Sequence, residues 1–278
     1  MKTIGFIDYY LSEWHANNYP QWIAAASERL GYSFKVAYAW AEMDTSPIDN
    51  VTTDEWCEKM GAERCESIKE LCEKSDYIII LAPSDPERHL AYAREALNCG
   101  KRTYIDKTFA PNYAEAAEIF RLGDEGGTEF FSTSALRYSA ELNSIESPRT
   151  VVTAGGGSNL PEYIIHQVEM VVKKLGIGAT SVTVDKNGDE AICRVSYQDG
   201  RAATMQFIPK HAFTMAADGG EPVAMRSDFF AALIEDILHF FMGAPLPFPR
   251  EETLEVMKIR EAVITAYATP GKEIIIRG

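Results

Sequence analysis

The chain has 278 residues, of which 46% are hydrophobic and 24% are charged, enough to bury the core of one large domain or of two ordinary ones. Its 27 Lys and Arg residues against 41 Asp and Glu residues give a net charge of -14, which argues against binding to nucleic acids or anionic membranes. The five cysteines are odd in number and form no C-x-x-C pair, so we expect reduced thiols in a cytoplasmic protein and no metal site.

The first half of the chain alternates predicted strands with predicted helices. Strands are expected at residues 3–8, 33–40, 77–83, 102–107 and 130–135, and helices at residues 20–30, 66–74, 86–100 and 112–127. The first strand starts too early to leave room for a signal peptide. This alternation with short connections predicts a Rossmann-like, doubly wound parallel sheet in a domain that spans residues 1–135.

The second half has a different rhythm, which predicts an α+β domain over residues 136–278. Here strands dominate, at residues 150–156, 181–186, 191–198, 201–208, 211–217 and 273–277, and helices are expected at residues 159–176, 227–242 and 250–267. Turn-like sequences join several of these strands, so the sheet should be open and largely antiparallel. No stretch is apolar and long enough to span a membrane, and we expect a soluble protein.

The segment that follows the first strand lacks the glycines of a nucleotide-binding turn. Asp8, Tyr10 and Glu13 stand where the pattern G-x-G-x-x-G would let backbone N–H groups approach a pyrophosphate. If the next helix begins at Pro20, residues 9–19 form a long aromatic loop; a cap at Ser12 would start the helix earlier. Aromatic rings interleaved with amides suit a sugar, although packing inside the protein explains such a loop equally well.

Two other groups of residues could carry chemistry. Asp106 and Lys107 end a predicted parallel strand, where doubly wound sheets bind ligands, but a solvated loop lysine would look the same. Glu162 and His166 are four residues apart on a predicted helix, so the carboxylate and the imidazole share one face and could orient one another. An ordinary surface ion pair has the same spacing.

These groups occur in the order found in a known protein family. The segment of residues 75–120 resembles the third βα unit of the Gfo/Idh/MocA family and its E-K-P signature, written here Asp106, Lys107 and Thr108. The sequence NLPEYIIHQVE resembles the D-x-x-x-H helix of that family, with Glu162 in place of the aspartate. SALRYSAEL resembles its crossing into the second domain, and the likeness covers essentially the whole chain.

The resemblance implies an oxidoreductase that transfers hydride between NAD(P) and a sugar, a polyol or a derivative. Lys107 would bind the reacting hydroxyl, His166 would take its proton and Glu162 would hold the histidine. The expected cofactor-binding residues are Asp8, Tyr9, Tyr10, Pro83 and Asp106. The expected substrate-binding residues are Trp14, His15, Asn17 and Arg137. The family also implies a homodimer or a higher homo-oligomer that forms through the sheet of the second domain.

The missing glycines leave three functional hypotheses open. The first is an oxidoreductase that binds NAD or NADP in an altered manner. The second is a redox-neutral sugar lyase or isomerase in which Lys107, Glu162 and His166 act as acid and base and the segment of residues 9–19 fills the nucleotide site. The third is a non-catalytic subunit that binds a sugar or a partner.

Overall fold

The computed structural model describes residues 1–276, and within them the chain forms two compact units. The first unit combines Met1–Ser132 with Leu233–Pro247, and the second combines Thr133–Ala232 with the chain from Phe248 onward. The break after residue 132 lies close to the predicted boundary at residue 135. The return of residues 233–247 to the first unit is absent from the prediction, because a single boundary cannot represent a chain that crosses more than once.

The first unit is built on a six-stranded sheet with the strand order β3-β2-β1-β4-β5-β6. The strands are β1 (Lys2–Asp8), β2 (Phe34–Ala41), β3 (Glu63–Arg64), β4 (Tyr77–Ile80), β5 (Thr103–Asp106) and β6 (Phe130–Thr133). The pairs formed by β1 with β2 and β4, by β2 with β3 and by β4 with β5 are parallel. The order reverses direction beside β1, which makes the carboxyl ends of β1 and β4 the switch point of the sheet.

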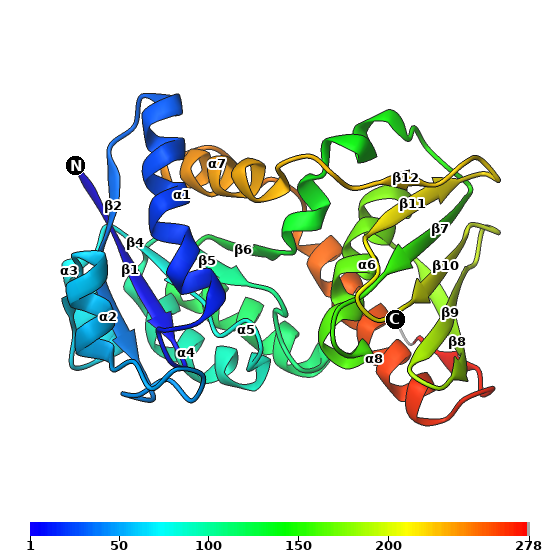
Figure 1. Cartoon of the computed structure of the whole chain (residues 1–278), viewed down its shortest axis with the longest axis horizontal. Coiled ribbons are helices and arrows are strands. Elements are labelled where there is room, and N and C mark those ends of the chain that lie inside the picture. The colour runs from blue at the N-terminus through cyan, green and yellow to red at the C-terminus, as the bar shows by residue number, and fades with distance from the viewer. Residues whose placement is uncertain (277–278) are drawn as a thin grey trace. The chain divides into compact units, whose positions relative to one another are not determined.

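Helices connect and cover these strands (Figure 1). They are α1 (Trp14–Leu30), α2 (Thr53–Met60), α3 (Ile68–Lys74), α4 (His89–Ala96), α5 (Tyr113–Gly126) and α7 (Phe229–Phe241), with short 3-10 turns at Pro86–Arg88 and Leu97–Cys99. The end of α7 packs on the first unit because its aromatic rings are buried there. Phe241 stacks on Tyr77 at 4.7 Å between ring centroids, and Phe240 meets Phe131 edge-on at 5.2 Å.

The helix α1 begins earlier than a start at Pro20 predicts. It starts at Trp14, after a cap at Glu13, and contains Pro20 within it. The prediction of a long aromatic loop over residues 9–19 is therefore wrong, because residues 14–19 belong to the helix. Gly31 ends the helix in the left-handed conformation, as its position predicts.

The second unit is built on a seven-stranded sheet with the order β12-β11-β7-β10-β9-β8-β13. Its strands are β7 (Thr150–Gly155), β8 (Ala179–Asn187), β9 (Glu190–Tyr197), β10 (Ala202–Phe207), β11 (Thr214–Ala217), β12 (Val223–Ala224) and β13 (Ile274–Ile275), and its helices are α6 (Leu160–Leu175) and α8 (Arg250–Ala268). Two further 3-10 turns span Ala135–Tyr138 and Ala140–Ser144. The predicted closing strand runs to Arg277, which lies outside the described residues.

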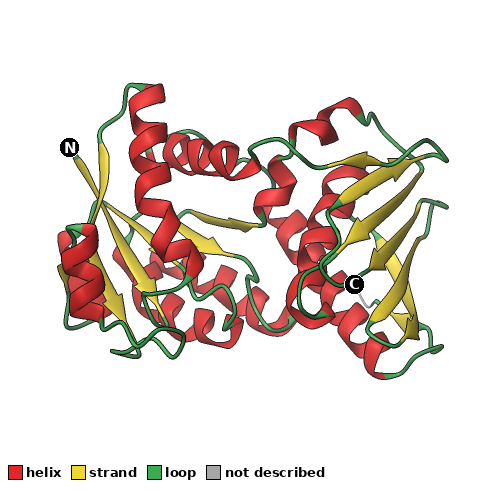
Figure 2. Ribbon diagram, viewed as in Figure 1, coloured by secondary structure: helices red, strands yellow, loops and turns green. Residues whose placement is uncertain are grey.

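All strand pairs of this second sheet for which a direction is given are antiparallel except that of β10 with β7 (Figure 2). The helix α6 is fixed to the sheet by Gln167, which is fully buried. Its side-chain oxygen accepts from the Thr153 hydroxyl at 2.6 Å and its amide donates to the Gly155 carbonyl at 2.8 Å. The predicted fold class, a doubly wound parallel sheet followed by an α+β unit with a largely antiparallel sheet, is confirmed.

Two further features bear on the sequence predictions. Among residues 1–276, no helix is both long enough and apolar enough to cross a membrane. All five cysteines are free thiols, and four of them are buried. Burial raises the pKa of the Cys57 and Cys65 thiols to about 11, so these groups are poor nucleophiles.

Candidate functional site

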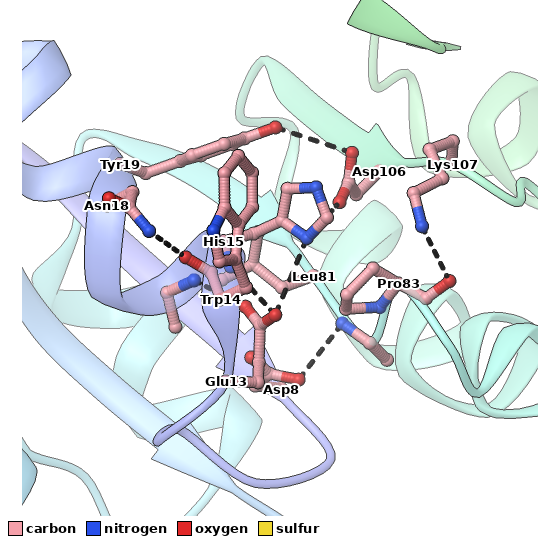
Figure 3. A network of polar contacts seen from close by, with 12 residues as sticks. Asp8, Glu13, Trp14, His15, Asn18, Tyr19, Leu81, Pro83, Asp106 and Lys107 are labelled. Carbon is pink, nitrogen blue, oxygen red and sulfur yellow. Dashed lines mark hydrogen bonds and ion pairs between the residues drawn. The ribbon is translucent and has the colours of Figure 1, made fainter. Parts of the chain in front are cut away.

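Acidic side chains gather at the switch point of the first unit. Asp8 ends β1, Asp106 ends β5, and Glu13 precedes α1 (Figure 3). Asp8 and Asp106 are each 1% exposed and Glu13 is 7% exposed, although carboxylates seldom lie so deep in a protein without partners. The partners of these three groups therefore define what this edge of the sheet can do.

The carboxylate of Asp8 joins the ends of two neighbouring strands. Its Oδ1 atom accepts the backbone N–H of Tyr9 at 2.7 Å and that of Ala82, just beyond β4, at 3.0 Å. Its Oδ2 atom is buried and has no hydrogen-bond partner among the described residues. Burial raises the pKa of the Asp8 carboxyl well above its usual range, and the negative charge of Glu13 is the second cause of this rise.

Glu13 caps the helix α1 with its side chain. One carboxylate oxygen accepts the N–H of His15 at 2.8 Å, and the other accepts the N–H of Ala16. These are the N–H groups that a helix cannot satisfy internally, and they carry its partial positive charge. A buried carboxylate of the chain itself therefore occupies the end of α1 at which this type of fold binds an anion.

His15 lies between two of the carboxylates. Its Nδ1 atom is 3.4 Å from Glu13 Oε2 and 3.6 Å from Asp106 Oδ2, and the side chain is 10% exposed. Two acceptors facing Nδ1 favour the tautomer that carries its proton there, which leaves Nε2 as the basic nitrogen. The hydroxyl of Tyr104 donates to Asp106 Oδ1 at 3.1 Å and that of Tyr19 approaches it at 3.5 Å, so Asp106 is itself held in place.

Lys107 follows Asp106 directly and is 9% exposed. Its ammonium group donates to the carbonyl of Pro83 at 3.3 Å, and Figure 3 shows His15 and Lys107 on opposite sides of Asp106. The loops that present these groups are joined by the buried His89. Its Nδ1 lies 3.0 Å from the Phe109 carbonyl, and its Nε2 contacts the Leu81 carbonyl.

The remaining residues predicted near the nucleotide site have varied surroundings. Trp14 is 51% exposed and packs edge-on against Trp22 at 5.4 Å. Asn17 is held inside the unit, because its side-chain oxygen accepts from the fully buried Trp56 at 3.0 Å. The Trp14 side chain is therefore accessible, and its contact with substrate stays a prediction, whereas the oxygen of Asn17 positions α1.

Tyr9 and Tyr10 contact each other at 5.8 Å between ring centroids. The guanidinium of Arg88 lies 4.6 Å from the Tyr9 ring and pairs with Glu42 at 3.0 Å. Glu42 also accepts from the Tyr92 hydroxyl at 2.8 Å. The acidic residue that follows β2 thus has two partners from the chain itself.

The other two predicted catalytic residues lie in the second unit, on α6. His166 Nδ1 lies 2.6 Å from the hydroxyl of Ser134. The carboxylate of Glu162 accepts from the Asn159 amide at 3.1 Å, and its backbone N–H is capped by the same residue. Orientation of His166 by Glu162 stays a prediction, whereas Ser134 is an orienting partner that the sequence analysis misses.

Glu169 and Arg137 form a buried pair beside Ser134. The Arg137 guanidinium donates to Glu169 at 3.3 Å, contacts Glu252 and lies 3.9 Å from the Phe248 ring. Glu169 accepts the Ser134 N–H at 3.1 Å, so this pair fixes the residue that holds His166. Arg137 was predicted to bind substrate, and its guanidinium is engaged by these side chains. A glutamate within the apolar run VEMVV was the signal that could have revealed Glu169.

Comparison with known proteins supports the fold. No family model and no curated protein matches the chain. A putative myo-inositol dehydrogenase from Sinorhizobium meliloti 1021 matches with a TM-score of 0.76 at 13% identity over 100% of both chains. The UDP-N-acetylglucosamine 3-dehydrogenase GnnA from Acidithiobacillus ferrooxidans matches with a TM-score of 0.74 at 16% identity, over 95% of this chain and 97% of that chain.

A third similar structure was solved with a dinucleotide. GenD2 from gentamicin A biosynthesis, in complex with NAD, matches with a TM-score of 0.74 at 10% identity, over 100% of this chain and 97% of that chain. At such low identities the likeness shows the fold alone. The chain thus has the two-unit fold of NAD-binding dehydrogenases, and the resemblance to the Gfo/Idh/MocA family is supported at that level.

The residues at the usual dinucleotide position do not fit a pyrophosphate. In this fold the pyrophosphate rests on a glycine turn and on the N-terminus of the first helix. Here the Glu13 carboxylate already accepts the N–H groups of His15 and Ala16, and the Asp8 carboxylate replaces the first glycine. Two more negative charges placed among these buried acids would be strongly repelled.

Substitution of Asp8 by asparagine tests the electrostatics of this site. Because the folded-state pKa is raised, the folded chain holds the Asp8 proton more tightly than the unfolded chain does. The resulting stabilisation is fully present below the ordinary carboxyl range near pH 4 and is lost as the pH rises through the raised pKa. Asp8→Asn keeps the Oδ1 acceptor and should therefore be more stable than the wild type at pH 7 to 8.

Denaturant unfolding across pH 4 to 8 measures this effect. The gain should be about 1.4 kcal/mol for each unit by which the pKa is raised. Asp76→Asn is a control of opposite sign, because the hydrogen bonds that Thr3 donates lower the pKa of Asp76. A stability difference between wild type and Asp8→Asn that does not vary with pH would contradict a raised pKa.

Proposed function

We propose that this protein catalyses redox-neutral acid–base chemistry on a ketosugar or a sugar acid. The observation that carries the proposal is the pair of carboxylates, Glu13 and Asp106, that lie 3.4 Å and 3.6 Å from the Nδ1 atom of His15 at the switch point of the sheet. Ligands of doubly wound sheets bind at this point. The sugar class is supported by two of the similar structures, a putative myo-inositol dehydrogenase and a UDP-N-acetylglucosamine 3-dehydrogenase.

The proposed roles follow from the chemistry of each group. His15 Nε2 would remove a proton from a carbon next to a carbonyl, and Asp106 and Glu13 would stabilise the imidazolium that forms. The Lys107 ammonium group would stabilise the negative charge on the carbonyl oxygen. Return of the proton to the neighbouring atom gives an isomer, and loss of a hydroxyl as water gives a dehydrated product. Neither outcome requires an oxidant or a reductant.

Residues of the second unit are proposed catalytic groups as well. His166 is held by Ser134 and sits on the helix that the sequence analysis singled out, with Glu162 one turn earlier. The half-exposed ring of Trp14 is proposed to pack on the apolar face of the sugar.

Proton exchange with solvent tests this proposal. The protein is incubated in D2O with a panel of ketoses, inososes and uronic acids, and NMR follows the carbon-bound protons. We expect deuterium to enter one class of compound at a carbon next to its carbonyl, with no change in oxidation state. The Lys107→Ala variant should lose this exchange. A panel with no exchange above that of the buffer would refute the acid–base function for these classes.

The second candidate is an oxidoreductase that uses NAD or NADP in an altered pose. It is favoured by the fold that the chain shares with NAD-binding dehydrogenases, among them GenD2, solved with NAD. Titration calorimetry with NAD(H) and NADP(H) distinguishes the two candidates. The acid–base proposal expects no binding, whereas micromolar binding would favour the oxidoreductase.

We also propose that the chain forms a homodimer or a larger homo-oligomer in the cytoplasm, through the seven-stranded sheet. The residues of β9 alternate between buried and exposed, and the exposed face of this sheet includes Val152 and Ile192, which are 41% and 36% exposed. Apolar side chains on an open sheet favour association. Light scattering coupled to size-exclusion chromatography gives the mass, and a monomer at micromolar concentration would contradict this proposal.

A further inference from the structure

We propose that the side chains of Asp8 and Glu13 replace the pyrophosphate of a dinucleotide as a built-in anion, and that they close this edge of the sheet to any phosphate-bearing ligand. In dinucleotide-binding folds, the turn after the first strand and the N-terminus of the first helix bind the pyrophosphate. Its consequence for the substrate rests on the proposed acid–base function, whereas the anion replacement itself does not.

Backbone donors are the first line of evidence. Four N–H groups at the switch point belong to Tyr9, Ala82, His15 and Ala16, and groups of this kind bind phosphate oxygens in such folds. Asp8 accepts the first two and Glu13 accepts the last two. Two carboxylates thus make the hydrogen bonds that two phosphate groups would otherwise make.

Charge and burial are the second line of evidence. Asp8 Oδ2 is fully buried and has no hydrogen-bond partner within residues 1–276, so no donor there compensates this oxygen. The charge of Asp106 also interacts unfavourably with Asp8. A phosphate would have to displace Glu13 from the helix end before it could reach these N–H groups.

The adenosine end of the usual dinucleotide position gives independent support. In this fold an acidic residue after the second strand binds the ribose hydroxyls. The acidic residue at this place is Glu42, whose two carboxylate oxygens are bound by Arg88 at 3.0 Å and by Tyr92 at 2.8 Å. Arg88 also packs on the ring of Tyr9. Side chains of the first unit thus occupy the groups that would bind the ribose as well as those that would bind the pyrophosphate.

A substrate class follows from this closure. A phosphorylated sugar or a nucleotide-linked sugar carries the negative charges that this edge repels. The substrate of the proposed reaction is therefore a sugar or a sugar derivative that has a carbonyl group and no phosphate.

Removal of the built-in anion should restore anion binding. Serine is a good helix cap without charge, so Glu13→Ser keeps α1 capped while it releases part of the N–H set. Glu13→Gly restores the last glycine of the fingerprint. Inorganic pyrophosphate is the probe, and its affinity is measured by calorimetry at constant ionic strength. We expect no binding to the wild type and binding to Glu13→Ser and Glu13→Gly that is at least about ten-fold tighter.

Asn112→Gly is the matched control, because Asn112 caps α5 through its side chain in the same unit but at a helix end without buried carboxylates. Pyrophosphate binding to the wild type, or a gain in Asn112→Gly equal to that in Glu13→Gly, would overturn the proposal. So would the absence of any gain in Glu13→Ser with an intact thermal unfolding transition. The acid–base function fails separately, through absent deuterium exchange in the wild type.

Discussion

Replacement of Glu169 by alanine is expected to lower the free energy of unfolding of the second unit by about 3–5 kcal/mol. Glu169 is 4% exposed and accepts hydrogen bonds from the Arg137 guanidinium, the Thr133 hydroxyl and the backbone N–H of Ser134. The substitution removes one partner of the buried Arg137 guanidinium. It also removes the acceptor of the buried Ser134 N–H. Removal of one member of a buried pair costs far more than the pair contributes.

Denaturant unfolding measures the loss, and two further variants interpret it. Glu169→Gln keeps the shape and an acceptor for Ser134, so its loss should be smaller. Glu190→Ala removes an exposed glutamate from the same unit and should change the stability by less than about 0.5 kcal/mol. If Glu169→Ala matched Glu190→Ala, the buried pair would not stabilise the unit.

The same substitution links the stability of the unit to His166. Ser134 receives the bond from Glu169 and lies against His166 Nδ1, so loss of Glu169 frees the residue that orients the histidine. This link could not be predicted from the sequence. Ser134 and His166 are far apart along the chain, and no local spacing relates a serine after β6 to a histidine on α6.

The strands could be predicted well because each buried strand requires apolar side chains whatever its neighbours are. The run YIIILAP predicts β4 as a strand buried on both faces, and Ile78 and Ile79 are fully buried in the structure. The start of α1 could not be predicted in the same way. Pro20 is typical of a first helical turn, but tertiary packing and the Glu13 cap sustain the helix through it.

In the candidate site, too, the positions at strand ends could be predicted, whereas the contacts between side chains could not. The sequence predicts that Asp8 and Asp106 lie at the carboxyl ends of parallel strands, and the structure places both there. The sequence gives no reason for Glu13 to turn back onto its own helix, because a glutamate is an unusual cap. From the sequence alone, the segment that follows β1 shows only that the glycines of a phosphate-binding turn are replaced. The structure shows that the Glu13 carboxylate accepts the N–H groups at the start of α1.

His15→Asn is expected to reduce deuterium exchange into the responsive compound by about 10²–10⁴-fold, the range typical for loss of a general base. The neighbouring variant Asp106→Asn should reduce it as well. An asparagine keeps the oxygen that Tyr104 needs but can present an amide donor to His15 Nδ1, which reverses the favoured tautomer and removes the lone pair from Nε2. The fall should appear in kcat and not in KM, because the proton transfer is affected rather than ground-state binding.

His239→Asn is the matched control for these variants. His239 lies on α7, where its Nδ1 is 3.0 Å from the Tyr32 hydroxyl, and it should leave exchange unchanged. Exchange that survives in His15→Asn but disappears in His166→Ala would assign the base to α6 and leave His15 a structural partner of Glu13. The two variants therefore decide on which of the two histidines the exchange depends.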